Sequence, residues 1–188
     1  TEGRVKLKFY PGGVMGNSDT VRRKMRVGRL HGGAFTGGEL AEVYPDFGLY
    51  SLPFLFEDEE EVLHLRAEFD ELMAAGLASR GLVLLGVAGG GFVYLMSESE
   101  VTTLEALRQS KVWVPEGDVI SEMALRDAGV APIPIPLADV YTALQTGVID
   151  TVMNTSVGAI AFQWHTRVRH MTDLPVAYVV GALAIDKR

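Results

Sequence analysis

Residues 137–154 constrain the fold of this chain more than any other segment. Leu137 to Thr146 has the apolar spacing of a helix, Gly147 can end that helix, and Val148 to Val152 is an apolar run typical of a strand. The segment closes at Asn154, whose amide is expected at the end of the strand. A helix joined to a strand through one glycine predicts a compact α/β unit.

The same alternation extends along the chain. A helix is predicted to begin near Asn17 or Ser18, either of which can cap its first turn, and a longer helix runs from Asp58 to about Ser79. The acidic run 58–61 suits a helix N-terminus, where the helix dipole favours negative charge, better than a cation or partner site. Further helices are expected at 104–108, 119–128 and 156–170, and further strands at 4–10, 31–35, 82–87, 92–96, 111–114, 133–136 and 175–185.

Strands that alternate with helices of this length predict an α/β fold with mostly parallel sheets and with ligand sites outside the carboxyl ends of strands. Gly89–Gly91 interrupts the pattern. It lacks the spacing of a G-x-G-x-x-G or Walker motif and leads into a strand, so a turn or hinge is favoured over a phosphate loop.

Composition excludes several classes of function. The net charge of -7, from 17 Lys and Arg against 24 Asp and Glu, gives no electrostatic footprint for nucleic acid. With no cysteine, the sequence has neither thiolate zinc ligands nor a cysteine nucleophile. His165 and His170 are five residues apart and do not have the spacing of two zinc ligands on one helix face. We therefore expect no cofactor and no metal.

Trp113 lies between two valines in the predicted strand 111–114. Because side chains alternate along a strand, Trp113 is expected to face opposite to Val112 and Val114. If the valines pack on helices, the indole would face the other side of the sheet or its edge and form a pocket wall. Packing in the core is the alternative for Trp113, as it is for Trp164.

Two segments carry a resemblance to a known family. Residues 104–115, which end a strand at Pro115, and residues 138–154 together resemble the solute-binding receptors of tripartite ATP-independent periplasmic (TRAP) transporters, the DctP-like family. The opening residues 1–13 and the segment 52–56 are also similar. Members of this family are longer at both ends, so the resemblance implies a receptor fragment, with any signal peptide outside the chain.

The resemblance implies a two-lobed, periplasmic-binding-protein-like α/β fold that is incomplete at both ends. Residues 1–88 would form most of the first lobe, residues 89–173 most of the second, and residues 174–188 a strand returning to the first lobe. Such receptors are periplasmic and non-enzymatic. They close around an organic solute and deliver it to membrane permease subunits.

The resemblance also suggests site residues. Trp113 matches the arginine that usually binds the solute carboxylate, and Val93 matches a second common arginine. Asn154 matches a ligand-contacting asparagine and Leu137 a position that is often aromatic, while Phe35 and Trp164 would complete the wall. Such a site is apolar with one amide, which suits a larger, hydrophobic or neutral ligand, or an atypical acid held by another arginine.

Two alternatives remain open from the sequence. The first is an enzyme on a similar α/β scaffold, which would need a nucleophile and base or a metal cluster near the strand ends. The second is a receptor fold used for protein interaction, which would bind no small molecule.

Overall fold

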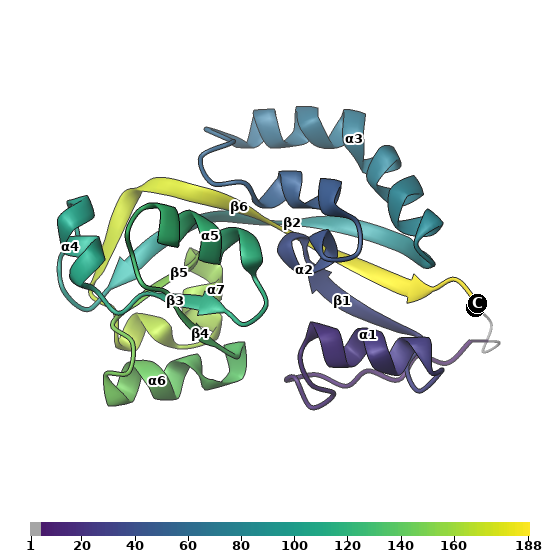
Figure 1. Ribbon diagram of the computed structural model, residues 1–188, viewed down its shortest axis with the longest axis horizontal. Helices are drawn as coiled ribbons and strands as arrows, with labels where there is room; N and C mark the ends of the chain where they lie inside the picture. Colours follow the sequence, from purple (N-terminus) through teal and green to yellow (C-terminus); the bar gives the residue numbers. More distant parts are fainter. Residues whose placement is uncertain (1–4) are drawn as a thin grey trace.

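The computed structural model describes residues 5–188, and two long strands organise its backbone. β2 (Leu82–Ser97) and β6 (His170–Asp186) lie side by side and cross most of the molecule (Figure 1). β1 (Gly32–Thr36) pairs with β6, and β5 (Thr151–Thr155) pairs with β2. The sheet therefore has the order β1-β6-β2-β5, with β1 and β5 toward opposite ends of the long pair.

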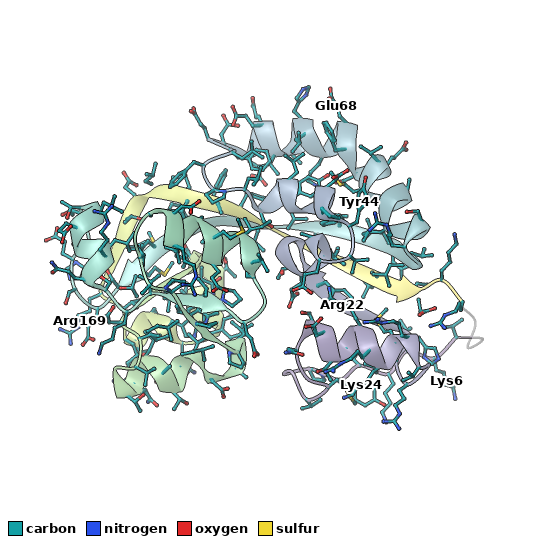
Figure 2. The ribbon with its side chains drawn as sticks, in the orientation of Figure 1. Lys6, Arg22, Lys24, Tyr44, Glu68 and Arg169 are labelled. Carbon is teal, nitrogen blue, oxygen red and sulfur yellow. The ribbon has the colours of Figure 1, made fainter. Side chains whose placement is uncertain are left out.

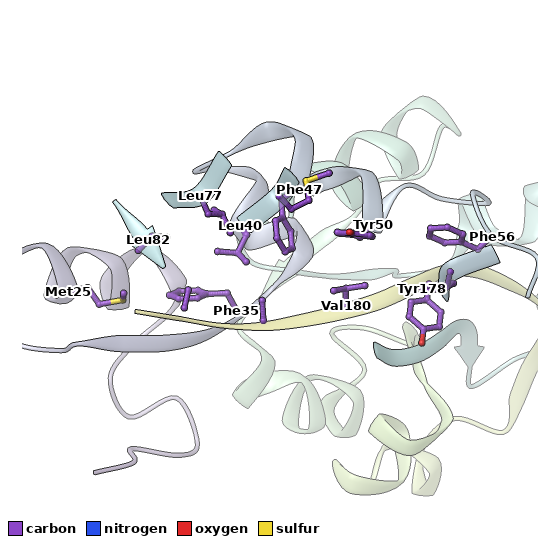
Figure 3. Packing of buried hydrophobic residues seen from close by; sticks show 14 residues of the cluster. Met25, Phe35, Leu40, Phe47, Tyr50, Phe56, Leu77, Leu82, Tyr178 and Val180 are labelled. Atoms are coloured by element: carbon purple, nitrogen blue, oxygen red, sulfur yellow. The ribbon is translucent and has the colours of Figure 1, made fainter. Parts of the chain in front are cut away.

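One group of elements, which we call the first lobe, packs around β1 and the adjoining halves of the long strands (Figure 1). Its core includes Leu40, Phe47, Tyr50 and Leu77, each with no exposed surface (Figure 3). The rings of Phe47 and Tyr50 meet edge to face with 5.5 Å between their centroids. The helices of this lobe are α1 (Ser18–Arg26), α2 (Gly37–Ala41), the 3-10 helix η1 (Pro45–Ser51) and α3 (Glu59–Ser79).

A second group, which we call the second lobe, gathers at the other end of β2 and β6 (Figure 1). Its strands β3 (Trp113–Pro115) and β4 (Ile133–Ile135) pair in parallel, and Val112 bridges in parallel to Thr151. Two clusters of buried residues hold it together, one on each side of β3. Its helices are α4 (Leu104–Gln109), α5 (Val119–Asp127), η2 (Leu137–Asp139), α6 (Val140–Thr146), α7 (Ser156–Ala161) and η3 (Trp164–Thr166).

The predicted α/β class is confirmed, but the expectation of mostly parallel sheets is wrong for residues 5–188. All three pairings in the four-stranded sheet are antiparallel, and parallel pairing is confined to the neighbourhood of β3. The reason is topological. β2 leads from the first lobe to the second and β6 leads back, so the two strands must run in opposite directions.

The expected strand at 4–10 does not form in the described residues. Residue 4 lies outside them, and residues 5–10 belong to no sheet. Leu7 and Phe9 are 76% and 75% exposed. Alternating apolar residues produce a strand only where a neighbouring edge pairs with the backbone, and period alone does not supply that edge.

The glycine segment lies inside a strand. The separate strands expected at 82–87 and 92–96 are one continuous β2, which contains an irregularity in its pairing with β6 between Gly89 and Gly91. Gly91 has φ of +101°, and a Cβ on Gly89 would lie 2.3 Å from the Tyr178 hydroxyl. Glycine is required here because the strand bulges and Tyr178 comes close to its backbone.

The predicted helix ends are mostly confirmed. Asn17 caps α1 by accepting from the Thr20 N–H at 3.1 Å, and Asp58 caps α3 by accepting from the Glu61 N–H at 3.0 Å. The helix expected at 156–170 is shorter: α7 stops at Ala161, and His170 already begins β6. None of the helices formed by residues 5–188 combines the length and apolar character needed to cross a membrane.

The left-handed cap at the end of α6 can be tested by substitution. Gly147 has φ of +68°, and a Cβ there would meet nothing within 4 Å, so only the left-handed backbone disfavours a side chain. We expect Gly147→Ala to lower the free energy of unfolding by about 1–2 kcal/mol, measured by urea denaturation. Gly86→Ala is the matched control, because its Cβ also meets nothing and its φ is ordinary. An equal loss of stability in both variants would contradict the left-handed cap.

Candidate functional site

A cleft of about 1090 Å³ separates the two lobes on one side of β2 and β6. The first lobe contributes the start of α1 and the end of β1, while the second lobe contributes the turn after β3 and the start of η2. The sheet itself supplies the floor, from β2 and β6. The lining side chains of the cleft include Phe35, Thr36, Glu39, Leu85, Pro115, Glu116 and Leu137.

The charged residues that line the cleft are both acidic. Glu39 comes from the first lobe and Glu116 from the second, and none of the described lining residues is Lys, Arg or His. Glu39 is oriented by a capping box at the start of α2: the Thr36 N–H and hydroxyl donate to its Oε2 at 2.8 and 3.2 Å. The cleft therefore carries negative charge on both walls.

Arg22 is a cation that hydrogen-bonds to a residue of this capping box. Arg22, which Figure 2 labels, is buried, donates to the Glu39 carbonyl oxygen at 2.8 Å, and forms ion pairs with Asp19 and Glu42. Burial opposes its charge, but the hydrogen bonds to Glu42 and Asp19 outweigh that effect and hold the guanidinium pKa above its usual value. Through these contacts Arg22 helps to hold α1 against α2.

Other labelled cations in Figure 2 lie away from the cleft. The ammonium of Lys24 donates to the Met15 carbonyl oxygen at 2.8 Å. Lys6 and Arg169 lie near opposite outer ends of the molecule. None of the three belongs to the cleft lining.

A second, smaller hollow of about 350 Å³ also draws on both lobes. Val93, Leu95 and Met153 line it from β2 and β5, and Tyr178 lines it from β6. The lobes approach each other at its edge: a Cβ on Gly38 would lie 3.1 Å from the Asp118 carboxylate oxygen. This hollow is almost wholly apolar, with Asp118 as its charged lining residue.

The structure places Trp113 in the core of the second lobe. As predicted, it faces away from Val112 and Val114, which belong to a different buried cluster. However, its side chain is only 3% exposed, its Nε1–H donates to the Ile135 carbonyl oxygen at 2.9 Å, and its ring meets Trp164 edge to face at 5.2 Å. This placement differs from the predicted pocket wall, because α6 and the segment from α7 to η3 cover the face to which the indole points.

Asn154 lies on the opposite face of the sheet from Val93. Directly paired residues share a face, so Asn154 shares one with Tyr94, whereas Val93 shares the other with Thr155. The Asn154 Oδ1 accepts from the Thr155 N–H at 2.8 Å, and the amide rests against Gly158, where a Cβ would come within 2.4 Å of Oδ1. The amide nitrogen has no hydrogen-bond acceptor among residues 5–188 and remains available.

The six predicted site residues therefore do not converge on one surface. Phe35 and Leu137 line the cleft, although Phe35 is only 3% exposed. Val93 lines the smaller hollow, while Trp113, Trp164 and Asn154 line neither space.

Sequence reasoning missed the polar lining residues Thr36, Glu39 and Glu116. A signal for two of them was present, because Thr36 and Glu39 have the T-x-x-E spacing of a capping box. Glu116 follows Pro115 directly after the predicted strand 111–114, at a strand end where ligand sites commonly lie. Within residues 5–188, no three His, Asp or Glu side chains gather in a way that could hold a metal ion.

Two lobes joined by a long strand pair, with a cleft between them, are the geometry of a solute receptor, and sequence comparison decides the family. The sequence profile of the bacterial extracellular solute-binding protein family 7, DctP, matches residues 1–187. The chain belongs to this family. Family 7 proteins are solute-binding proteins rather than enzymes, which removes the enzyme alternative.

Individual relatives agree with this assignment. A solute-binding protein of Chromohalobacter salexigens is 31% identical over 82% of this chain and 46% of its own length. The C4-dicarboxylate-binding periplasmic protein DctP of Rhodobacter capsulatus is 26% identical over 100% of the chain and 57% of its own length. A TRAP periplasmic solute-binding protein from Xanthobacter autotrophicus, solved with bound β-D-galacturonate, has a TM-score of 0.90 and 26% identity over 100% of the chain and 63% of its own. The chain thus spans about half to two thirds of these family 7 proteins.

The buried tryptophan gives a prediction about this family 7 chain. We expect Trp113→Arg to lower the free energy of unfolding by at least about 3–5 kcal/mol, because it empties part of the core and buries a charge without a partner. It should not create a carboxylate site. The measurements are urea unfolding and calorimetric titration with succinate.

Two conservative variants separate the contributions of ring and hydrogen bond. Trp113→Phe removes the bond to Ile135, whereas Trp164→Phe makes the same change in a neighbouring ring that donates no such bond. Trp113→Phe should be less stable than Trp164→Phe by about 1 kcal/mol. A stable Trp113→Arg protein that binds succinate would show that position 113 faces the ligand after all.

Proposed function

We propose that this chain is the ligand-capturing part of a periplasmic receptor of a TRAP-type transporter, which closes its cleft around an organic solute and delivers it to membrane permease subunits. The observation that supports this most is the cleft between two lobes that are joined by β2 and β6. Bending of two paired strands would change the cleft without unfolding either core. We place the lobe boundaries at 88/89 and near 174, positions that fall within β2 and β6.

The solute is proposed to differ from those of the relatives compared above. The Rhodobacter capsulatus protein is named for C4-dicarboxylates, and the Xanthobacter autotrophicus structure holds β-D-galacturonate. At the two positions where the family resemblance leads us to expect arginine, this chain has Val93 and Trp113, both buried. Neither side chain can form the paired hydrogen bonds that a guanidinium makes to a carboxylate, so we infer a solute with a substantial apolar surface.

Asn154 is proposed to supply a directional contact to the solute. Its amide nitrogen has no acceptor within the described residues, and its orientation depends on the space that Gly158 leaves open. Because Asn154 lines neither hollow as the lobes stand, this role requires that closure bring the solute to β5.

Identification of the bound solute is the direct test. Native mass spectrometry of the full-length receptor as purified, followed by release of the bound compound, should reveal a small organic molecule with a ring or an extended apolar portion. Recovery of a short dicarboxylate would contradict the apolar solute. A second possible result is that the purified receptor carries no small molecule and that no compound of a broad metabolite panel stabilises it against heating. That result would favour the alternative of a protein-interaction module.

The role of Asn154 can be tested through its neighbour. Gly158→Ala should push the Asn154 amide aside, while the alanine itself suits a helix, so stability should change by less than about 1 kcal/mol. We expect the affinity for the released solute to fall about tenfold, as for loss of one good hydrogen bond, and Asn154→Ala to do the same. Gln109→Ala, which removes an exposed amide on α4, is the control. If Gly158→Ala and Asn154→Ala both bind normally, Asn154 is not a ligand residue.

A further inference from the structure

The two charged residues of the cleft lining come from different lobes. Glu39 lies at the start of α2 in the first lobe, and Glu116 lies in the turn between β3 and α5 in the second. Neither carboxylate takes part in an ion pair within residues 5–188. Two charges of the same sign, neither of them in an ion pair within these residues, therefore lie on the two walls that closure would bring together.

The remaining lining of the cleft does not neutralise them. Its larger side chains are apolar, among them Phe35, Leu85, Pro115 and Leu137. The starts of α1 and α2 are positive features of the lining, since a helix N-terminus carries partial positive charge. The start of α1 is already offset, because Asn17 caps the Thr20 N–H and Asp19 lies in the first turn. The start of α2 is offset by Glu39 itself, through the capping box.

Closure is consequently coupled to the charge of the ligand. As water leaves a closing cleft, the repulsion between Glu39 and Glu116 grows, because the medium between them becomes less polarisable. A neutral solute leaves this repulsion in place, and an anionic solute increases it. A cation placed between the carboxylates converts the repulsion into two attractive interactions, so it favours the closed form over the open one.

We propose that the solute carries a positively charged group, a protonated amine or a quaternary ammonium, that binds between Glu39 and Glu116 while its apolar portion contacts the walls of the cleft. This inference rests on the proposed function, since it assumes that the cleft captures a small organic solute. It assigns Glu39 and Glu116 as the residues that determine specificity. The capping box also fits the role, because the hydrogen bonds from Thr36 fix one oxygen of Glu39 and leave the other to a ligand.

The test compares matched probes on the full-length receptor. Benzylamine, benzyl alcohol and benzoate share one skeleton and differ in charge, and cyclohexylamine, cyclohexanol and cyclohexanecarboxylate form a second set. Calorimetric titration and thermal denaturation would be run with each compound. The charge of any compound released from the purified protein would also be determined. We expect the ammonium member of a set to bind at least about tenfold more tightly than the alcohol, and the carboxylate to bind most weakly.

Two variants assign the effect to the carboxylates. Glu39→Gln keeps a side-chain acceptor for the cap, and Glu116→Gln changes an exposed residue, so both should fold. Each should weaken binding of the ammonium probe, or of the released solute, about tenfold and leave binding of the alcohol unchanged. Glu71→Gln, an exposed change of the same charge on α3, should have no effect.

The outcomes separate this inference from the function on which it rests. The proposal of a cationic solute is overturned if the released solute or the best probe is an acid without a basic group, or if neither glutamine variant weakens tight binding. Either result leaves the receptor function standing. A full-length receptor that carries no solute and binds no member of either probe set or of the metabolite panel counts against both.

Discussion

The pairing of β2 with β6 is the interaction on which the rest of the structure depends. These two strands pass from one buried cluster to the other, and each carries one of the shorter strands of the sheet: β6 pairs with β1, and β2 pairs with β5. The first core closes against Leu82, Val180 and Ala184, and the second against Met96. Loss of this pairing would separate the lobes and remove the floor of the cleft at the same time.

The second lobe shows how a position suited to a polar residue can become part of a core. A strand residue that faces away from its neighbours has two possible environments, a ligand space or a packed layer, and the sequence does not distinguish them. At Trp113, the indole fills the layer beneath α6 and satisfies its one donor on Ile135. The arrangement stabilises the lobe, and under the proposed function it leaves ligand recognition to groups elsewhere in the cleft.

Local signals in the sequence were sufficient for several helix ends and for the class of the fold. Asn17, Asp58 and Gly147 act through contacts within a few residues, and each behaves as its type predicts. Three features depend on partners distant in the chain, which no local pattern encodes: strand direction, the position of residues 5–10 outside the sheets, and the burial of Trp113. For the same reason, the sequence identified Phe35 and Leu137, which line the cleft, but not Glu116, which reaches the cleft only through the packing of the two lobes.

The close approach of Tyr178 to Gly89 bears on how bending of β2 could be followed by nuclear magnetic resonance. The Tyr178 ring lies between Phe56 and Phe92 in edge-to-face contacts, with centroid distances of 6.3 and 5.0 Å, and its hydroxyl lies over the irregular centre of β2. Any flexing of the strand at that point must change the ring currents that these three aromatic side chains impose on one another. Under the proposed closure, in which β2 and β6 bend, the proton resonances of Tyr178 would therefore report bending of β2 at this point, without an attached label.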